Sequence, residues 1–138
     1  MTQEEKELLL KDLSARLPYG VKIHNPHPRF PNSDEYIQTL TDIHGTMQSN
    51  WITFGTDYEE INVNWNIGNK EEDVPKPYLR SIKTMTEEEG HDFARSIADS
   101  TQSIPVGFFD YCNEHHIDYR GLISKGLAIE APSNMYNN

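Results

Sequence analysis

The six residues from Ile61 to Asn66, Ile-Asn-Val-Asn-Trp-Asn, alternate between apolar side chains and asparagines. Successive side chains of a β-strand point to opposite faces, so this stretch predicts a strand with one buried face and one wet face. Such a strand is typical of an antiparallel sheet, because parallel sheets are usually covered on both sides. The alternation therefore predicts an antiparallel sheet in the middle of the chain.

Four more segments have the composition of strands. Gly55, Thr56 and Asp57 stand between two of them and predict a hairpin turn. The last strand is expected at an edge of the sheet, because Pro77 has no amide hydrogen to donate within a ladder. In chain order, the expected strands are Tyr19 to Ile23, Tyr36 to Ile43, Asn50 to Phe54, Glu60 to Asn66 and Pro77 to Ile82.

Helices are predicted on both sides of the strands. Thr2-Gln3-Glu4-Glu5 has the pattern of a capping box, and leucines at three- and four-residue spacing follow it. This pattern predicts a helix over about Gln3 to Leu17, ended by Pro18 and Gly20. A second capping box at Thr86-Glu87-Glu88-Glu89 predicts another helix in the last third of the chain.

Two further helices are expected near the C-terminus. The first should begin at Pro105, which suits a first helical turn, and run to about His116. The second, Tyr119 to Lys125, should be capped by Asp118 and ended by Gly126 in a left-handed conformation.

This order of elements predicts the fold class. An N-terminal helix, an antiparallel β-meander of about four strands and then a group of helices indicate an α+β fold, with the C-terminal helices packed on one face or end of the sheet. The chain has 138 residues and no linker-like segment, so we expect a single domain, 1–138.

The charge of the chain limits its partners. Twenty-two acidic residues against 12 basic ones give a net charge of −10. A negative field repels phosphate, so we expect neither nucleic acid nor an anionic membrane as a partner, whereas a basic protein remains suitable. The single cysteine, with no signal-peptide pattern and no membrane-length apolar run, predicts a cytoplasmic protein. The oligomeric state stays open.

The candidate reactive pair is Cys112 and His116, which fall one turn apart on the apolar face of the helix expected there. Zinc requires three or four protein ligands, and two do not make a site. We interpret the pair as a core cysteine with a hydrogen-bonded histidine, and we assign no catalytic residue, metal or cofactor. The alternative is a hydrolase or metal-binding enzyme that uses both residues with a distant histidine or carboxylate.

Two segments are candidates for a partner surface. Three prolines between positions 26 and 31 predict a stiff, extended loop, whose residues His27, Arg29 and Phe30 could contact a partner. The second candidate is the pair Tyr119 and Arg120. The two tryptophans, at positions 51 and 65, are expected as core and cross-strand partners. The best functional hypothesis is a small acidic interaction or regulatory module without catalysis.

Three stretches carry a resemblance. They are EEKELLLKDLSARLPYGVK at 4–22, KPYLRSIKTMTEEE at 76–89 and IDYRGLISKGLAIEAPSNMY at 117–136. Together they resemble a family of short uncharacterised proteins encoded by gut bacteria of the Bacteroides group and by their phages or mobile elements. The resemblance implies an intracellular bacterial or phage setting, and it implies no activity or site residue.

Overall fold

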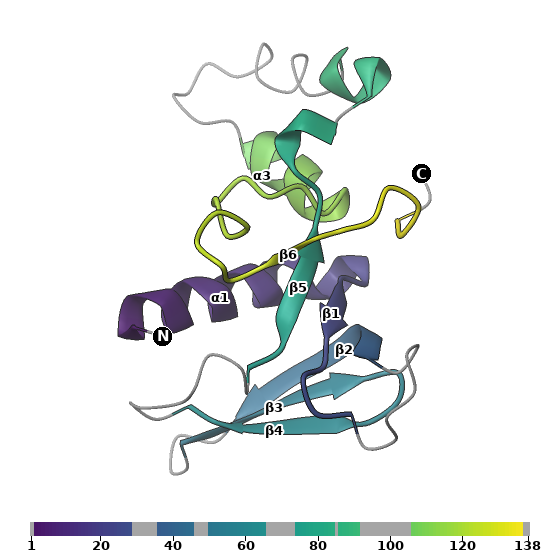
Figure 1. The fold of residues 1–138 in the computed structure, drawn as a ribbon. Coiled ribbons are helices and arrows are strands. Elements are labelled where there is room, and N and C mark those ends of the chain that lie inside the picture. The colour runs from purple at the N-terminus through teal and green to yellow at the C-terminus, as the bar shows by residue number, and fades with distance from the viewer. Residues whose placement is uncertain are drawn as a thin grey trace. The chain divides into compact units, whose positions relative to one another are not determined.

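The computed structural model of the chain describes residues 2–28, 36–45, 50–65, 74–84, 86–91 and 106–136. The chain forms two compact units, Met1–Tyr78 and Leu79–Asn138, and the expectation of a single domain stays a prediction. The fold is α+β, as predicted, with an N-terminal helix and a mostly antiparallel six-stranded sheet (Figure 1). The strand order is β4 (Glu60–Asn64), β3 (Trp51–Thr56), β2 (Ile37–Gly45), β1 (Lys22–His24), β5 (Lys76–Leu79) and β6 (Ile129–Glu130). Five of these strands fall at the five predicted segments, and β6 does not.

Helix α1, Gln3–Arg16, begins at the predicted capping box. The Glu5 amide donates to the Thr2 hydroxyl at 3.1 Å, and the Thr2 amide donates to the Glu5 carboxylate at 2.9 Å. The α-helix ends one residue before the predicted Leu17. A 3₁₀ turn, η1 (Leu17–Tyr19), follows, and Gly20 then takes a left-handed φ of 65°.

The buried face of α1 contains charge as well as leucine. Leu9 and Leu13 are fully buried, as the leucine spacing predicts. Lys6, Asp12 and Arg16 are also buried, and Arg16 Nε donates to Asp12 Oδ2 at 3.0 Å. The four-residue spacing of this ion pair is visible in the sequence. The sequence does not predict that the pair is buried, because charged side chains are usually exposed.

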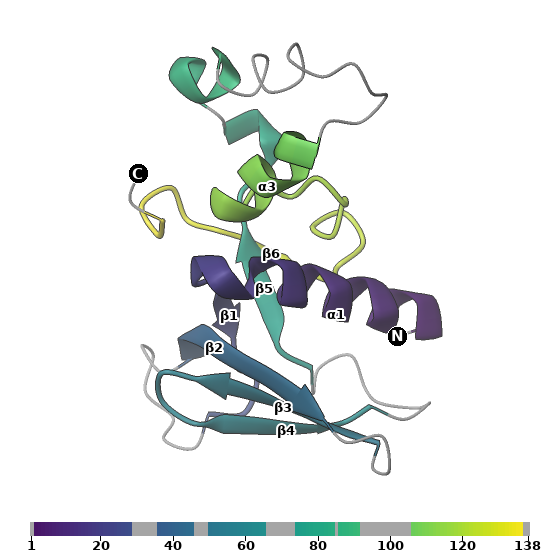
Figure 2. The ribbon, with the colours of Figure 1, turned by 180° about the vertical axis from the view of Figure 1, so that it is seen from behind.

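The first four strands form an antiparallel meander. Their bounds are β1 Lys22–His24, β2 Ile37–Gly45, β3 Trp51–Thr56 and β4 Glu60–Asn64. Figures 1 and 2 show β2, β3 and β4 side by side from opposite directions. The predicted alternation is confirmed in β4, because Val63 is buried while Asn62 is exposed. The Trp65 ring packs 5.9 Å from that of Phe54.

The turn between β3 and β4 is organised by one hydroxyl group. Thr56 Oγ1 accepts the amides of Tyr58 at 3.1 Å and Glu59 at 3.0 Å. It also lies 2.8 Å from Gln38 Oε1, to which it can donate. The predicted hairpin is therefore confirmed, and the neighbouring strand β2 is tied to its turn.

The position predicted for the proline-containing strand is wrong. Strand β5, Lys76–Leu79, lies between β1 and β6 (Ile129–Glu130) in the sheet order, not at an edge. On one side Pro77 pairs with Ile23 of β1. On the other side the Ala131 amide donates to the Leu79 carbonyl at 2.8 Å, two residues beyond the proline. The proline is tolerated because that bond does not need its missing amide hydrogen.

The second unit contains the 3₁₀ turn η4 (Ile82–Thr84), a helical segment at 87–91, helix α3 (Val106–Glu114) and β6. Helix α3 ends at Glu114, two residues before the predicted end near His116. His116 takes a left-handed φ of 58°. The Ile117 amide donates to the Cys112 carbonyl and the His116 amide to the Asn113 carbonyl. These two bonds form a Schellman motif, with a histidine where glycine is usual.

The helix predicted at 119–125 is also wrong, although its capping residue is correctly placed. The Asp118 carboxylate accepts the amides of Leu122 at 2.8 Å and Ile123 at 2.9 Å. The segment forms turns, because Gly121 has a left-handed φ of 72° that interrupts a right-handed helix. Gly126 has a φ of 74°, as predicted.

Removing the Asp118 carboxylate should destabilise this turn. We expect Asp118→Ala to lower the free energy of unfolding by about 0.5–2 kcal/mol, because two amides lose their acceptors. Asp118→Asn should cost less, since its side chain keeps one acceptor oxygen. Leu122 is fully buried, and Leu122→Ala should cost about 2–5 kcal/mol. Urea melts measure the series, and the exposed Lys125→Ala, within about 0.5 kcal/mol, is the control.

Candidate functional site

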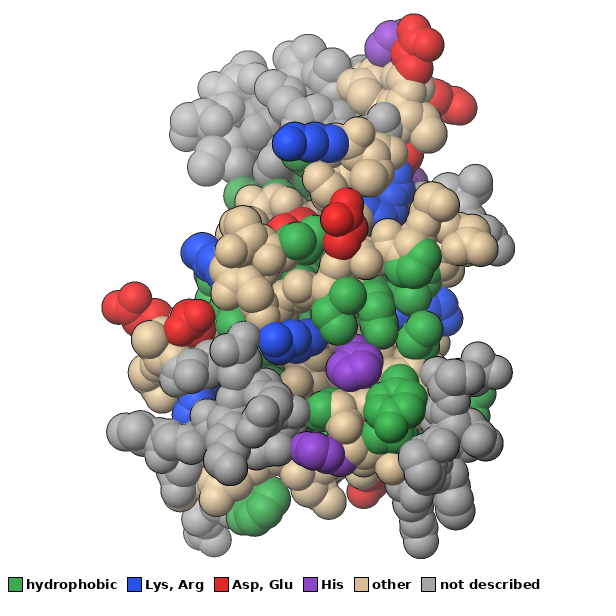
Figure 3. Space-filling model, viewed as in Figure 1, with side chains coloured by type: hydrophobic (Ala, Val, Ile, Leu, Met, Phe, Trp, Pro, Cys, Tyr) green, Lys and Arg blue, Asp and Glu red, His purple; other side chains and the backbone are tan. Residues whose placement is uncertain are grey.

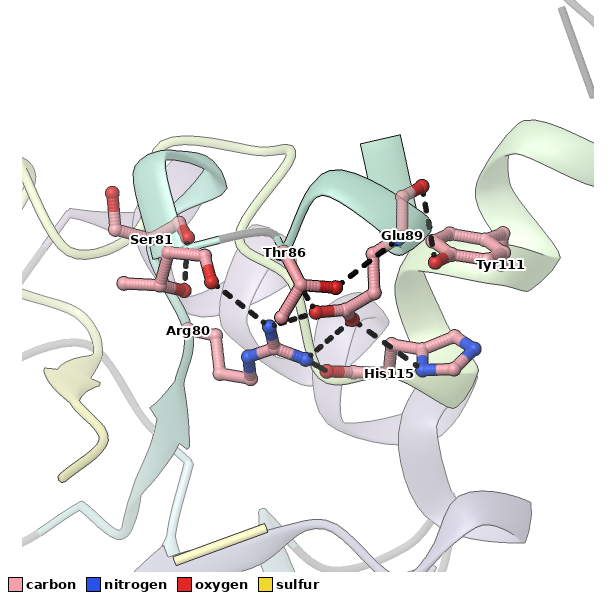
Figure 4. Close-up of polar contacts among 7 residues, drawn as sticks. Arg80, Ser81, Thr86, Glu89, Tyr111 and His115 are labelled. Atoms are coloured by element: carbon pink, nitrogen blue, oxygen red, sulfur yellow. Dashed lines mark hydrogen bonds and ion pairs between the residues drawn. The ribbon is translucent and has the colours of Figure 1, made fainter. Parts of the chain in front are cut away.

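A polar cluster in the described part of the second unit is centred on Arg80, just after β5. Its guanidinium donates two 2.8 Å hydrogen bonds to the Glu89 carboxylate, and Figure 4 shows the two groups face to face. The same guanidinium reaches the carbonyls of Thr84 at 3.3 Å and His115 at 3.5 Å. Arg80 therefore holds three chain segments together through its own side chain.

Glu89 has a second role in the same cluster. The Thr86 amide donates to its carboxylate at 3.1 Å, and the Glu89 amide donates to the Thr86 hydroxyl at 3.1 Å. This is the predicted capping box, which is confirmed. The Tyr111 hydroxyl donates to the Glu89 carbonyl at 3.3 Å, so the start of the 87–91 helix is tied to α3.

The electrostatics of the pair follow from its geometry. The hydrogen bond from Arg80 is the largest cause that lowers the pKa of Glu89 from 4.5 to about 2; burial acts in the opposite direction, and Thr86 adds a smaller lowering. The hydrogen bond to Glu89 raises the pKa of Arg80, although burial opposes it. Both side chains are nearly buried, at 13% and 12% exposed. The two groups thus form a charged pair at all physiological pH values.

A polar pocket of about 410 Å³ lies beside this pair. It is lined by Arg80, Thr84, Thr86, Glu89, Glu130, Ala131, Pro132, Ser133 and Tyr136. Because the charges of Arg80 and Glu89 neutralise each other, the lining offers mainly hydroxyl groups and the exposed carboxylate of Glu130. The pair itself acts as a structural clamp.

The two residues of the predicted reactive pair differ in backbone conformation, although both are buried. Cys112 lies within α3 and is fully buried. His116 lies beyond the end of α3, and its ring stacks on Tyr136 with centroids 3.9 Å apart. The two residues therefore do not share one face of a helix, which was the basis for grouping them. A thiol that reacts must also be accessible, and Cys112 is not.

The predicted partner residues are only partly described. Tyr119 and Arg120 are half-buried, and Arg120 donates to the Tyr119 hydroxyl at 2.7 Å. The Tyr119 ring also packs against Phe109, with centroids 5.1 Å apart. His27 is exposed, whereas Arg29 and Phe30 lie outside the described residues.

His27 lines a groove of about 360 Å³ in the first unit, which we call the β4 groove. The groove runs along β4, and sequence reasoning did not find it. Its lining residues are Asn25, Pro26, His27, Trp51, Glu59, Glu60, Ile61, Asn62, Val63 and Asn64. The stiff loop predicted at the prolines therefore supplies one wall, and the alternating strand supplies the floor.

The pairing of β3 with β4 places Trp51 in this groove. Trp51 stands opposite Asn64, and Thr53 stands opposite Asn62, to which its hydroxyl donates at 2.7 Å. Directly opposed residues share one face of a sheet, so Trp51 lies on the asparagine side. Its side chain is 50% exposed, and the expectation that it lies in the core is wrong. The alternation in β4 predicts which face of that strand is wet. Only the register between β3 and β4 shows that Trp51 lies on the same face.

Hydrogen bonds fix the wall that the loop at the prolines supplies to the groove. The Asn25 side-chain amide donates to the Glu59 carboxylate at 2.6 Å, and the His27 amide donates to Asn25 Oδ1 at 3.0 Å. The second bond closes a tight turn around Pro26. The wall is therefore tied to Glu59, the residue just before β4.

His24, the residue before this wall, packs against two tyrosines. His24 stacks on Tyr36 with centroids 5.7 Å apart, and its Nδ1 lies 3.3 Å from the Tyr78 hydroxyl. Burial lowers the pKa of His24, with the charge of Lys76 as a smaller cause, and burial raises the pKa of Tyr78. Figure 3 shows histidine and hydrophobic side chains next to one another on one face. The neutral His24 keeps β1 and the wall in place.

The described part of the chain contains no group of three or more histidine, cysteine or carboxylate side chains placed to hold a metal ion. None of the described helices has the length and apolar character required to cross a membrane. Comparison of the chain with family models, curated proteins and solved structures finds no match.

The Arg80–Glu89 pair should make the free energy of unfolding depend on pH in the acid range. The pKa of Glu89 is lower in the folded state, so its contribution is complete above about pH 4.5 and is lost as pH falls toward about 2. Glu89→Gln keeps a capping-box side chain but removes the charge. At neutral pH we expect it to cost about 1–4 kcal/mol, between exposed and buried ion pairs.

The measurement is a set of urea melts from pH 7 to pH 2. The difference between the native chain and Glu89→Gln should shrink toward acid. The control is Glu88→Gln, which removes an exposed carboxylate next to it. A constant difference between native chain and Glu89→Gln at all pH values would contradict the role assigned to this pair.

Proposed function

We propose that the protein is a small non-enzymatic interaction or regulatory module, and that the β4 groove is its contact surface. The observation that supports this proposal most directly is Trp51, which is half-exposed at a groove built on a strand. Tryptophan is among the residues most enriched in the energetic centres of protein interfaces. Half of the Trp51 side chain is exposed, so its apolar ring is accessible to a partner.

The charge of the groove indicates the partner. Among the described residues of its lining, Glu59 and Glu60 carry carboxylates and none is lysine or arginine. The whole chain has a net charge of −10. Complementary charge favours encounter with a basic surface and disfavours nucleic acid and anionic membranes. The proposed partner is therefore a basic protein.

The setting that we propose is the cytoplasm of a bacterial cell, in agreement with the resemblance to proteins of the Bacteroides group and their phages or mobile elements. The supporting feature within the chain is its one cysteine, Cys112, which is buried in α3. No cofactor or metal is part of the proposal.

Selection from a random-peptide phage library tests the contact surface. We expect the native chain to enrich peptides rich in lysine or arginine, and Trp51→Ala to lose at least about tenfold of their binding, because interface tryptophans often contribute about 2 kcal/mol or more. Tyr58→Ala is the matched control, since Tyr58 is a 62% exposed aromatic residue in the same hairpin outside the groove. Selected peptides that bind Trp51→Ala as well as the native chain would refute the proposal.

A further inference from the structure

The pattern of backbone hydrogen bonds between β3 and β4 determines which residues of β4 direct their amides and carbonyls away from β3. The Thr56 amide donates to the Glu59 carbonyl at 2.8 Å, and at the other end the Trp65 amide donates to the Asn50 carbonyl at 2.5 Å. In an antiparallel pair, residues that bond to the partner strand alternate with residues whose backbone groups point away. Counted from either of these bonds, the odd-numbered residues of β4 bond toward β3.

The even-numbered residues therefore point their backbone amides and carbonyls away from β3. Glu60 and Asn62 are of this kind, and both side chains are exposed. Strand β4 ends the strand order, and among the described strands it pairs with β3 alone. Exposed backbone groups at a sheet edge are a template for an added strand.

The groove has the length of a short extended segment. At one end Asn25 is bonded to Glu59, and at the other Trp51 stands opposite Asn64. The five residues of β4 cover about 17 Å at about 3.4 Å per residue. A peptide of five or six residues in extended conformation therefore reaches from one end to the other.

The two ends differ in chemistry. Glu59 and the exposed Glu60 place carboxylates at the end near Asn25, where a lysine or arginine of the peptide would find an opposite charge. The Trp51 ring at the other end offers an apolar surface to an aliphatic side chain. A segment with a basic residue at one end and an apolar residue at the other fits both.

We propose that the β4 groove binds an extended, basic peptide segment of a protein partner, which adds to the outer edge of β4 as a further strand. This inference rests on the proposed function and specifies the mode of binding. A second copy of the chain fits less well, because it would bring another negatively charged chain to an acidic groove.

Two synthetic probes test this mode on the full chain. They are the capped peptides Lys-Val-Arg-Val-Thr-Leu and its reverse, Leu-Thr-Val-Arg-Val-Lys, so that either strand direction can place the basic residues near Glu60. The NMR amide signals of Glu60 and Asn62 should shift on binding, and their hydrogen exchange should slow. The probe that binds more tightly gives the strand direction.

Backbone methylation separates strand addition from binding through side chains alone. Each probe is made in two forms, with N-methyl groups on one or the other set of alternate amides. Because only one set faces β4, one form should lose affinity by roughly tenfold and the other should not. Glu60→Gln should weaken the unmethylated probe about two- to fivefold, whereas Glu7→Gln, exposed on α1, should leave it unchanged.

Equal affinity of the two methylated forms would overturn strand addition, while the proposed function would stand if the library peptides still require Trp51. Slow exchange at Glu60 and Asn62 without peptide, together with a dimer in sedimentation equilibrium, would assign the edge to a second copy and overturn the inference. Failure of the probes and of the Trp51-dependent library selection together would remove both proposals.

Discussion

The register between β3 and β4 is the constraint on which the β4 groove depends. It sets Trp51 opposite Asn64 and Thr53 opposite Asn62, where a hydroxyl donates to an amide oxygen at 2.7 Å. A slip of one residue would turn every side chain of a strand to the other face. The Thr56 hydroxyl prevents such a slip at the turn, because it accepts two amides of the hairpin.

The second unit depends on a different device, the Arg80–Glu89 pair. One carboxylate closes the capping box of the 87–91 helix and also accepts both bonds of the arginine. The backbone of Arg80 adds to this, since its amide donates to the His116 carbonyl and its carbonyl accepts the Asp118 amide. The polar groups of this cluster largely satisfy one another.

Local signals in the sequence were reliable where the deciding contacts are local. Both capping boxes, the hairpin turn and the left-handed Gly126 form as predicted, because each needs residues only a few positions apart. The helix predicted after Asp118 does not form, also for a local reason, because Gly121 is left-handed. The left-handed His116 had no such signal, because histidine is not the residue that usually ends a helix in this way.

The sequence alone determined where α1 and the strands β1 to β5 form, and that one face of β4 is wet. The tertiary structure decided which other side chains join that face. Trp51 could belong to either side of β3 until pairing fixed its register, and the loop at Asn25 comes to Glu59 across 34 positions of sequence. The four-residue spacing of Asp12 and Arg16 is also that of an ordinary surface ion pair, and only the tertiary structure shows that this pair is buried. Each outcome depends on contacts between distant segments, and local patterns carry no information about those contacts.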